Sequence, residues 1–503
     1  MTNFLNSLKE QTTVGKTQNG AKTYTSTLNA NLDFFANAGA MRSNTENVKQ
    51  LFSKAVSEDK EIALRNLVHL RNIRMGGLGE RDAFRKAYEV LVDTGDDTAI
   101  KLLKHVAEIG RWDDVVSIYD YAYSTNKKKV VDATVDLIAT QLNQDIQDMK
   151  AGKPVSLLAK WIPSTSVKSA PRREVAYKLA GSLGLGHNHK EYRKVLAKLR
   201  SYLDLVEKKL ANKEYYDIEF EKLPSKALFK YRQAFWNHTA EAYGEFLNRV
   251  ESGEVKMNVS NLLPYEIVRA YTESGWYGGV KDYDRVLEAS WSSLGDVIQG
   301  SDDNAIVVAD TSGSMMGDPW DVAESLAIYA AERMEGAFKN HFITFSTTPK
   351  LIQLPENGTL KDKMEEYHKH SEISDTDIAA VFNLILRTAI KNNTPQSELP
   401  SKIIIISDME FNQGTRNGDL TNFEVAKNNF ENAGYTLPDV VYWNVNSRSQ
   451  NGEVRFNEQG VALVSGLTPN IFAQVIGAPI TSPWEMMMEV LNKPEYSFVT
   501  ECL

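Results

Sequence analysis

Three oxygen-bearing side chains follow directly after a short apolar run. The run is residues 305–309, and Asp310, Ser312 and Ser314 come at alternate positions after it. An apolar run of this length predicts a buried strand, and a tight turn after it would let all three oxygens point to one spot. Carboxylate and hydroxyl oxygens are ligands that Mg²⁺ prefers, and such a site commonly keeps positions for water or an incoming acidic group. The turn therefore predicts part of a magnesium site.

Two later stretches could complete the ligand shell. Thr376 stands just before a helical pattern at 378–390, and Asp408 follows a second apolar run at 403–406. The carboxyl ends of parallel strands share one edge of a sheet, where ligands of such sheets bind. An ordinary strand, turn and helix without any metal is the competing interpretation. We predict a site for Mg²⁺, or for another divalent cation such as Mn²⁺, held by Asp310, Ser312, Ser314, Thr376 and Asp408.

The order of these pieces resembles the metal-ion-dependent adhesion site of von Willebrand factor A domains. That site has Asp-x-Ser-x-Ser, then a Thr at a helix start, then a strand followed by Ser-Asp. The resemblance implies a doubly wound, Rossmann-like α/β domain at 301–503, with a bound cation that captures an acidic group. The second loop departs from the Gly-Thr-Asp form frequent in that family, because Asp375 precedes Thr376. The extra carboxylate could tighten metal binding or discourage an anionic ligand, so the ligand class stays open.

Length and composition indicate a soluble globular protein with more than one domain. The chain has 503 residues, more than one core normally holds, and 42% of them are hydrophobic. No apolar run is long enough to span a membrane, and the first residues lack the pattern of a secretory signal. The single cysteine, Cys502, cannot form an internal disulfide. We therefore expect a cytoplasmic protein without a membrane partner.

Charge is divided unevenly along the chain. Residues 1–300 carry 43 Lys and Arg against 38 Asp and Glu, whereas residues 301–503 carry 14 against 28. Residues 151–200 hold 11 basic residues and only 2 acidic ones. Because Pro163 and Pro171 interrupt helix within this stretch, its basic side chains would be presented outward. They could contact phosphates or simply solvate helix faces, and composition alone leaves both interpretations open.

Residues 46–300 have a helical pattern almost throughout. Apolar residues recur at helical spacing, as at Val131, Val135 and Ile138, and glycine or proline breaks separate the helices. This predicts an all-α module of stacked antiparallel helix pairs like HEAT repeats, preceded by an extended segment at 1–45. Beyond the module, strands and helices alternate, which predicts a parallel α/β sheet.

Several motifs of the helical half resemble, in order, the Ro ribonucleoprotein (TROVE) module, and more closely its relatives that join this module to a von Willebrand A domain. The motifs are RNIRMGGLGER at 71–81, GRWDD at 110–114, KWIPS at 160–164, YRK at 192–194 and LPSKA at 223–227. The resemblance implies a module that can form a ring, with a basic surface for noncoding RNA and an opening for single-stranded ends of misfolded RNA. The RNA contacts expected from it are Lys160, Lys168, Arg172, Arg173, His187, Lys190 and Arg193.

Nothing in the sequence indicates a catalytic nucleophile. There is no Gly-x-Ser-x-Gly elbow and no P-loop, and Asp310 and Asp408 are assigned to a metal. We therefore expect no enzymatic activity and no dinucleotide cofactor. We consider two functions, of which the first, joined to a magnesium-binding von Willebrand A domain, is the one we expect and the second is the alternative. One is an RNA-binding protein similar to Ro that binds small noncoding or misfolded RNA, and the other is a scaffold without RNA whose metal site binds an Asp or Glu of a partner protein.

Overall fold

The computed structural model describes residues 11–186, 189–273, 279–414 and 420–503. A largely helical part is followed by an α/β part with a six-stranded sheet. This confirms the expected α + α/β class, with the sheet in the C-terminal half. Within the described ranges, no helix is both long enough and apolar enough to cross a membrane.

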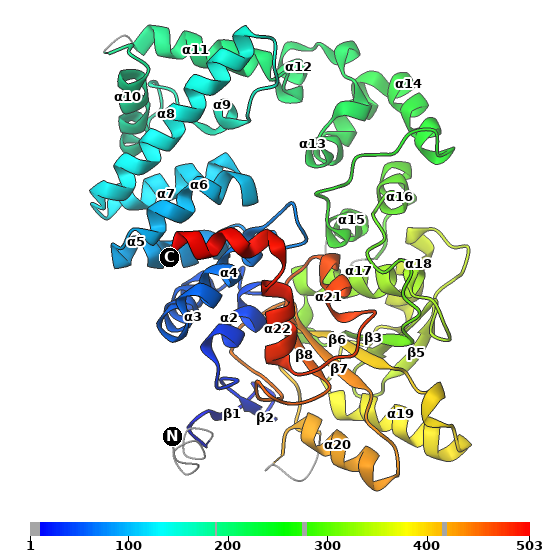
Figure 1. The fold of residues 1–503 in the computed structure, drawn as a ribbon. Helices are drawn as coiled ribbons and strands as arrows, with labels where there is room; N and C mark the ends of the chain where they lie inside the picture. The colour runs from blue at the N-terminus through cyan, green and yellow to red at the C-terminus, as the bar shows by residue number, and fades with distance from the viewer. Residues whose placement is uncertain (1–10, 187–188, 274–278, 415–419) are drawn as a thin grey trace.

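Most helices of the first part form where apolar residues recur at helical spacing. Figure 1 shows that they follow an arch, which rises from the sheet on one side, crosses at the far end and returns on the other side. In chain order they are α2 (Ala30–Ala38), α3 (Thr45–Glu58), α4 (Lys60–Arg71), α5 (Asp82–Thr94), α6 (Thr98–Ile109), α7 (Trp112–Ser124), α8 (Lys128–Lys150), α9 (Leu158–Trp161), α10 (Ala170–Ser182), α11 (His189–Tyr202), α12 (Val206–Asn212), α13 (Ser225–Lys230), α14 (Arg232–Glu251), α15 (Pro264–Tyr271) and α16 (Arg285–Ser292).

A single arginine joins the two ends of this arch. Arg42, between α2 and α3, donates one hydrogen bond of 2.8 Å to the hydroxyl of Tyr265 in α15. Its other nitrogens form two hydrogen bonds of 2.7 and 2.8 Å to the carboxylate of Glu80. The guanidinium also lies over the Tyr265 ring, 5.6 Å from its centroid. The start and the end of the helical part therefore contact each other directly, in addition to their contacts with the sheet.

The sheet has the strand order β5-β4-β3-β6-β7-β8. Only the β4–β5 pair is antiparallel. Counted along the chain within this sheet, the order is 3-2-1-4-5-6, which is found in doubly wound α/β folds. The strands are β3 (Ala305–Asp310), β4 (His341–Phe345), β5 (Lys350–Gln353), β6 (Lys402–Ser407), β7 (Asp439–Asn444) and β8 (Val461–Ser465).

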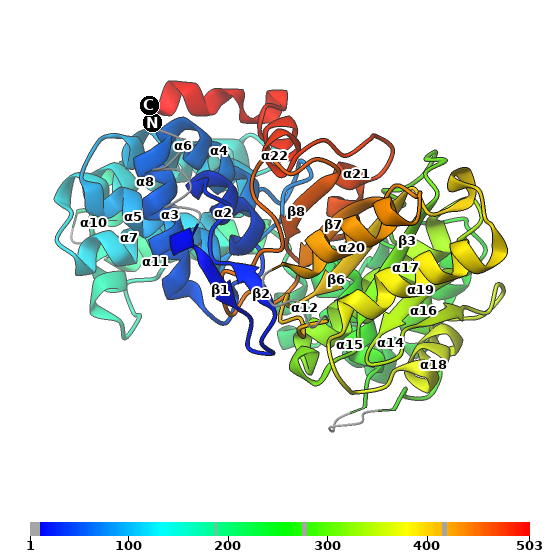
Figure 2. The same cartoon turned by 90° about the horizontal axis from the view of Figure 1, so that it is seen from below.

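Helices cover both faces of this sheet, which explains why its central strands are apolar throughout instead of alternating. Val307 of β3 faces a core that includes Leu326 of α17, whereas Val308 faces a second core that includes Phe382 of α19. Figure 2 shows α19 and α20 side by side along the sheet. The helices of this part are α17 (Asp318–Arg333), α18 (Leu360–His370), α19 (Ile378–Asn392), α20 (Asn422–Asn432), α21 (Phe472–Val475) and α22 (Pro483–Leu491).

Residues 11–45 form more secondary structure than the sequence indicated. A hairpin of β1 (Val14–Lys16) and β2 (Lys22–Tyr24) precedes α2, which lies in the segment expected to be extended. Leu32 and Phe34 of α2 are almost completely buried. The helix also buries Asn31, Asp33 and Asn37, so polar residues stand among its core positions. This mixture hides the apolar pattern from which a helix is normally predicted.

The C-terminal segment returns to the helical part. A 3-10 helix, η6 (Pro494–Cys502), packs against α4 and α6. There the hydroxyl of Tyr496 lies 2.9 Å from Nδ1 of the buried His69. One continuous buried cluster extends from Leu32 to Cys502. The helical part and the sheet therefore share a core across the expected boundaries at residues 45 and 300.

Acid should destabilise the protein through His69. Complete burial lowers the pKa of His69 from 6.5 to about 3. Between these pH values the unfolded chain takes up a proton that the folded chain does not, so stability present above pH 6.5 is lost as the pH falls, by about 1.4 kcal/mol per pH unit. Urea unfolding at pH 7.5 and 5.0 should show a smaller acid-induced loss for His69→Gln than for the wild type. An equal loss would show that His69 does not titrate in this way.

Candidate metal centre

The structure places the two predicted carboxylates next to each other at one edge of the sheet. Ala309 of β3 pairs with Ile406 of β6, so the residues that follow them leave the sheet together. Asp310 ends β3 and Asp408 lies just beyond β6. The direction of strand order reverses between these two strands, and ligands of such sheets bind in the crevice outside this point.

The turn after β3 brings two hydroxyls to the same place. The backbone N–H of Ser312 donates to Oδ1 of Asp310 at 2.9 Å, which holds the turn against the carboxylate. The hydroxyl oxygens of Ser312 and Ser314 are 3.0 Å apart, and the Ser314 side chain lowers the pKa of Asp408, which burial raises more strongly. The turn thus connects the carboxylates of two strands through short hydroxyl side chains.

Thr376 lies on a segment held between the ends of β3 and β6. On one side, the hydroxyl of Thr311 donates to the carbonyl of Glu372 at 3.2 Å. On the other side, the N–H of Asn412 donates to the carbonyl of Thr376 at 2.9 Å. Asn19, at the tip of the β1–β2 hairpin, donates to the Thr376 hydroxyl at 3.4 Å. Thr376 therefore lies on a segment that contacts residues beside the ends of both β3 and β6.

The electrostatics of the edge suit a cation. Burial and then the neighbouring carboxylate of Asp408 raise the pKa of Asp310 to about 7. Burial likewise raises the pKa of Asp408. Oδ2 of Asp408 is buried and accepts no hydrogen bond from any described residue. A buried anionic oxygen without a hydrogen-bond donor is unfavourable. Nη2 of Arg448, 3.6 Å away, offsets part of this charge, and a bound cation would offset more of it.

The donor set is two carboxylates with three hydroxyls, which suits Mg²⁺ or Mn²⁺. A cluster of three or more Asp, Glu, His or Cys that could hold a metal is absent from the described part of the chain. The site therefore depends on hydroxyl oxygens and on positions left for water or for a ligand's oxygen.

Three further residues complete the edge, and the sequence analysis did not assign them to it. Ser407 donates to Oδ2 of Asp310 at 2.5 Å. The N–H of Glu410 donates to Oδ1 of Asp408 at 3.2 Å. Arg448, on the loop after β7, has Nη2 3.6 Å from Oδ2 of Asp408. The position of Arg448 just beyond a parallel strand was the signal that could have identified it, because all such ends share this edge.

Three of the expected RNA contacts gather around one turn between α9 and α10. Arg173 donates to the carbonyls of Val167 and Lys168, at 3.1 and 2.9 Å. Arg193 of α11 donates to the hydroxyl of Thr165 at 3.2 Å. Lys168 itself is exposed. Lys168, Arg173 and Arg193 therefore form a basic cluster on the layer of α9, α10 and α11.

The other expected RNA contacts differ in their surroundings. Lys160 forms an ion pair of 3.0 Å with Glu207, and Arg172 forms one of 3.0 Å with Asp120. These pairs neutralise part of the positive charge that the sequence indicated. Lys190 is exposed on α11. His187 lies outside the described residues.

Comparisons with known proteins place the chain in a family. Residues 17–124 and 113–302 match the family described as "Domain of unknown function (DUF2828)", which covers more than half of the chain. The chain belongs to the DUF2828 family. Residues 304–489 match a second family, "Domain of unknown function (DUF7788)". A curated relative, "Uncharacterized protein L728" of Acanthamoeba polyphaga mimivirus, is 30% identical over 508 residues, which cover 95% of this chain and 87% of that protein.

The boundary between the two family matches falls directly before β3. Within the DUF2828 part, two of the sequence motifs meet in a buried ion-pair network. Asp114 is completely buried and accepts from Nε of Arg71 at 2.9 Å and from Nε of Arg85 at 2.7 Å. It also accepts from the N–H of Arg111 at 3.0 Å, which caps α7. Arg71 and Asp114, which come from the two motifs, therefore have a structural role in this network.

Proposed function

We propose that this DUF2828 chain is a divalent-cation-dependent binding protein, with a von Willebrand A-like C-terminal domain that captures an acidic group of a partner protein. The observation that supports this most is the buried Oδ2 of Asp408, which has no hydrogen-bond donor among the described residues and lies beside Asp310. Both carboxylates stand where the strand order reverses.

In this proposal Asp310 and Asp408 would supply the negative charge that holds the ion. Ser312, Ser314 and Thr376 would add neutral oxygens, directly or through water. The bound ion would attract an anionic oxygen of the partner at its remaining position. Ser407 would orient Asp310 through the hydrogen bond of 2.5 Å. The proposal includes no catalytic step.

Binding of one Mn²⁺ or Mg²⁺ per chain tests this function. Isothermal titration of the full chain should show a single site. Asp408→Asn should lower the metal affinity of this site by about 100-fold or more, because the loss of a direct metal ligand should cost at least as much as the loss of a residue that only supports a ligand. Asp302→Asn is the matched control, because Asp302 is an exposed acid before β3 with the same change in charge. Equal affinities of the two variants would contradict the proposal.

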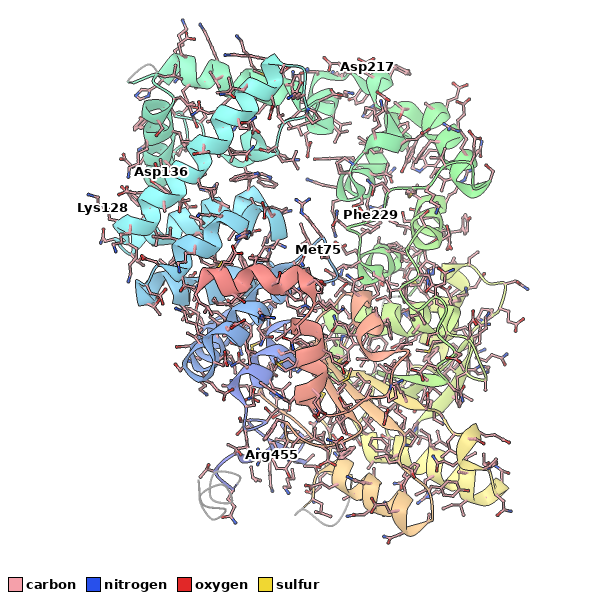
Figure 3. The ribbon with its side chains drawn as sticks, viewed as in Figure 1. Met75, Lys128, Asp136, Asp217, Phe229 and Arg455 are labelled. Carbon is pink, nitrogen blue, oxygen red and sulfur yellow. The ribbon has the colours of Figure 1, made fainter. Side chains whose placement is uncertain are left out.

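We propose RNA binding by the helical part as a second function, because of the basic cluster of Lys168, Arg173 and Arg193. The helix pairs would then stack in a HEAT-like, Ro-like (TROVE) module for small noncoding or misfolded RNA. Figure 3 shows Met75 and Phe229 on the inner side of the arch and Lys128 on its outer side. Met75 is 45% exposed, which would leave an apolar surface for a base on the inner side.

The basic cluster should contribute a salt-dependent part of RNA affinity. Replacing Lys168 and Arg193 of the cluster together with Lys190, an exposed residue of α11, by Ala should weaken binding of a structured RNA. The slope of log K against log salt should fall by about three, roughly one for each phosphate that is no longer neutralised. Filter binding at several salt concentrations measures both. A triple Ala variant of the exposed residues Lys128, Lys129 and Lys150 on α8 is the charge-matched control. The same slope in both triple variants would remove this second function.

A further inference from the structure

One cation stands among the acidic groups of the candidate metal centre. Nη2 of Arg448 lies 3.6 Å from Oδ2 of Asp408, and the same nitrogen donates to the carbonyl of Ser314. The side chain of Arg448 is 37% exposed, whereas that of Asp408 is not exposed at all. The guanidinium therefore lies on the solvent side of a carboxylate that is otherwise enclosed by protein.

The helical part holds the backbone of Arg448 in this place. Its neighbour Ser447 donates twice to α2 and the residues after it: the N–H to the carbonyl of Ala40 at 3.0 Å, and the hydroxyl to Oδ1 of Asn37 at 2.8 Å. Asn44 donates to the carbonyl of Arg448 at 3.4 Å. The loop is therefore anchored, while the exposed end of the long side chain can turn without disturbing the loop.

A divalent cation and this guanidinium compete for the same carboxylate. Both are positive, so an ion bound at Asp408 repels Nη2 of Arg448 from its position at 3.6 Å. An anionic ligand placed between the ion and the guanidinium would remove this repulsion, because it would attract both. Binding of the ion and of the anion would then strengthen each other.

We propose that Arg448 is the ligand-recognition residue of this centre. Without an ion it is the counter-charge of Asp408, and with an ion bound it turns to form a forked hydrogen bond with the carboxylate of an acidic protein segment. That carboxylate is held between the ion and Arg448. The inference rests on the proposed metal-dependent function and names the residue that selects its ligand.

The surroundings favour a carboxylate over a phosphate. Asp375 and Asp377 flank Thr376, and Glu410 is buried next to Asp408. Residues 301–503 carry 28 acidic and 14 basic residues in total. A single monoanionic carboxylate meets less repulsion here than a phosphate dianion or an RNA chain, and its two oxygens match the planar fork of an arginine.

Titration of the full chain with MnCl₂, with and without sodium acetate, tests this role. Acetate should increase the Mn²⁺ affinity of the wild type. Arg448→Ala should bind Mn²⁺ alone about five- to tenfold more tightly than the wild type, and acetate should no longer increase its affinity. Arg387→Ala, at an exposed arginine of α19, is the control for the change in net charge and should behave as the wild type.

Three results would overturn the inference. The first is an unchanged or weaker Mn²⁺ affinity of Arg448→Ala without acetate, and the second is an undiminished acetate effect in that variant. The third is a larger increase of wild-type affinity with methyl phosphate than with acetate, which would show that the centre selects phosphate. A wild type that binds no Mn²⁺ would overturn the proposed function itself, and this result differs from the other three.

Discussion

Replacing Asp310 by Asn should strongly weaken divalent-cation binding and leave the metal-free protein at least as stable as the wild type. The substitution removes one of the two charges that hold the ion, so we expect the affinity to fall by about 100-fold or more. It also removes a buried carboxyl group. Burial first, and then the neighbouring carboxylate of Asp408, raise the pKa of this group. The amide can keep both hydrogen bonds, by accepting from the N–H of Ser312 and donating to the hydroxyl of Ser407.

Thermal unfolding with EDTA and with MnCl₂ measures both effects. At an Mn²⁺ concentration of about 100 times its Kd, the ion should stabilise the wild type by about 2.7 kcal/mol. Asp310→Asn, with an affinity lower by about 100-fold or more, should keep at most about 0.4 kcal/mol of this stabilisation. A variant that gains as much from Mn²⁺ as the wild type would show that Asp310 does not hold the ion. A variant much less stable in EDTA would show that the carboxylate has a structural role instead.

Replacing Asp114 by Ala should destabilise the fold by about 3–5 kcal/mol, because it leaves Arg71 buried without a counter-charge. The side chain of Arg71 is only 3% exposed, and its Nη2 lies 2.8 Å from the Asp114 carboxylate. The variant also loses the hydrogen bond of 3.0 Å that caps α7 through the N–H of Arg111. Guanidinium chloride unfolding at neutral pH measures the loss.

Asp113→Ala is the matched control for this stability effect. Asp113 pairs with Arg85 and Arg111, but its side chain is 16% exposed and both partners are themselves partly exposed. We expect a loss of about 1 kcal/mol or less, since ion pairs in contact with water contribute little. Equal losses in the two variants would show that the burial of Asp114 is not what makes it important.

The six strands of the sheet and the helices α17, α19 and α20 could be predicted because each follows from local sequence, whereas α18, α21 and α22 were not predicted. Runs such as 403–406 are apolar at every position, since helices cover both faces of the sheet. The helix α2 could not be predicted in this way, because Asn31 and Asp33 are buried beside Leu32. The docking of η6 on α4 also had no local signal. It depends on contacts such as Tyr496 with His69, more than 400 residues apart in the chain.

The position of Asp310 and Asp408 at one edge of the sheet could be predicted because parallel strands end on the same side. Predicting the positions of Asp310 and Asp408 required only the assignment of two buried strands. The position of Arg448 could not be predicted in this way, because it depends on a loop that α2 anchors through Asn37. The RNA surface was predicted from a run of basic residues together with the resemblance to the TROVE module, and neither shows which side chains have partners. Lys160 and Arg172 proved to be paired with acids of other helices.

Anomalous diffraction at the manganese edge, from crystals grown with MnCl₂, tests the central claim most directly. We predict one strong peak at the edge of the sheet, bound to Asp310 and Asp408 directly or through water, with the guanidinium of Arg448 turned away from Asp408. A saturated crystal without a peak at this edge, and with Arg448 still 3.6 Å from Asp408, would contradict the account.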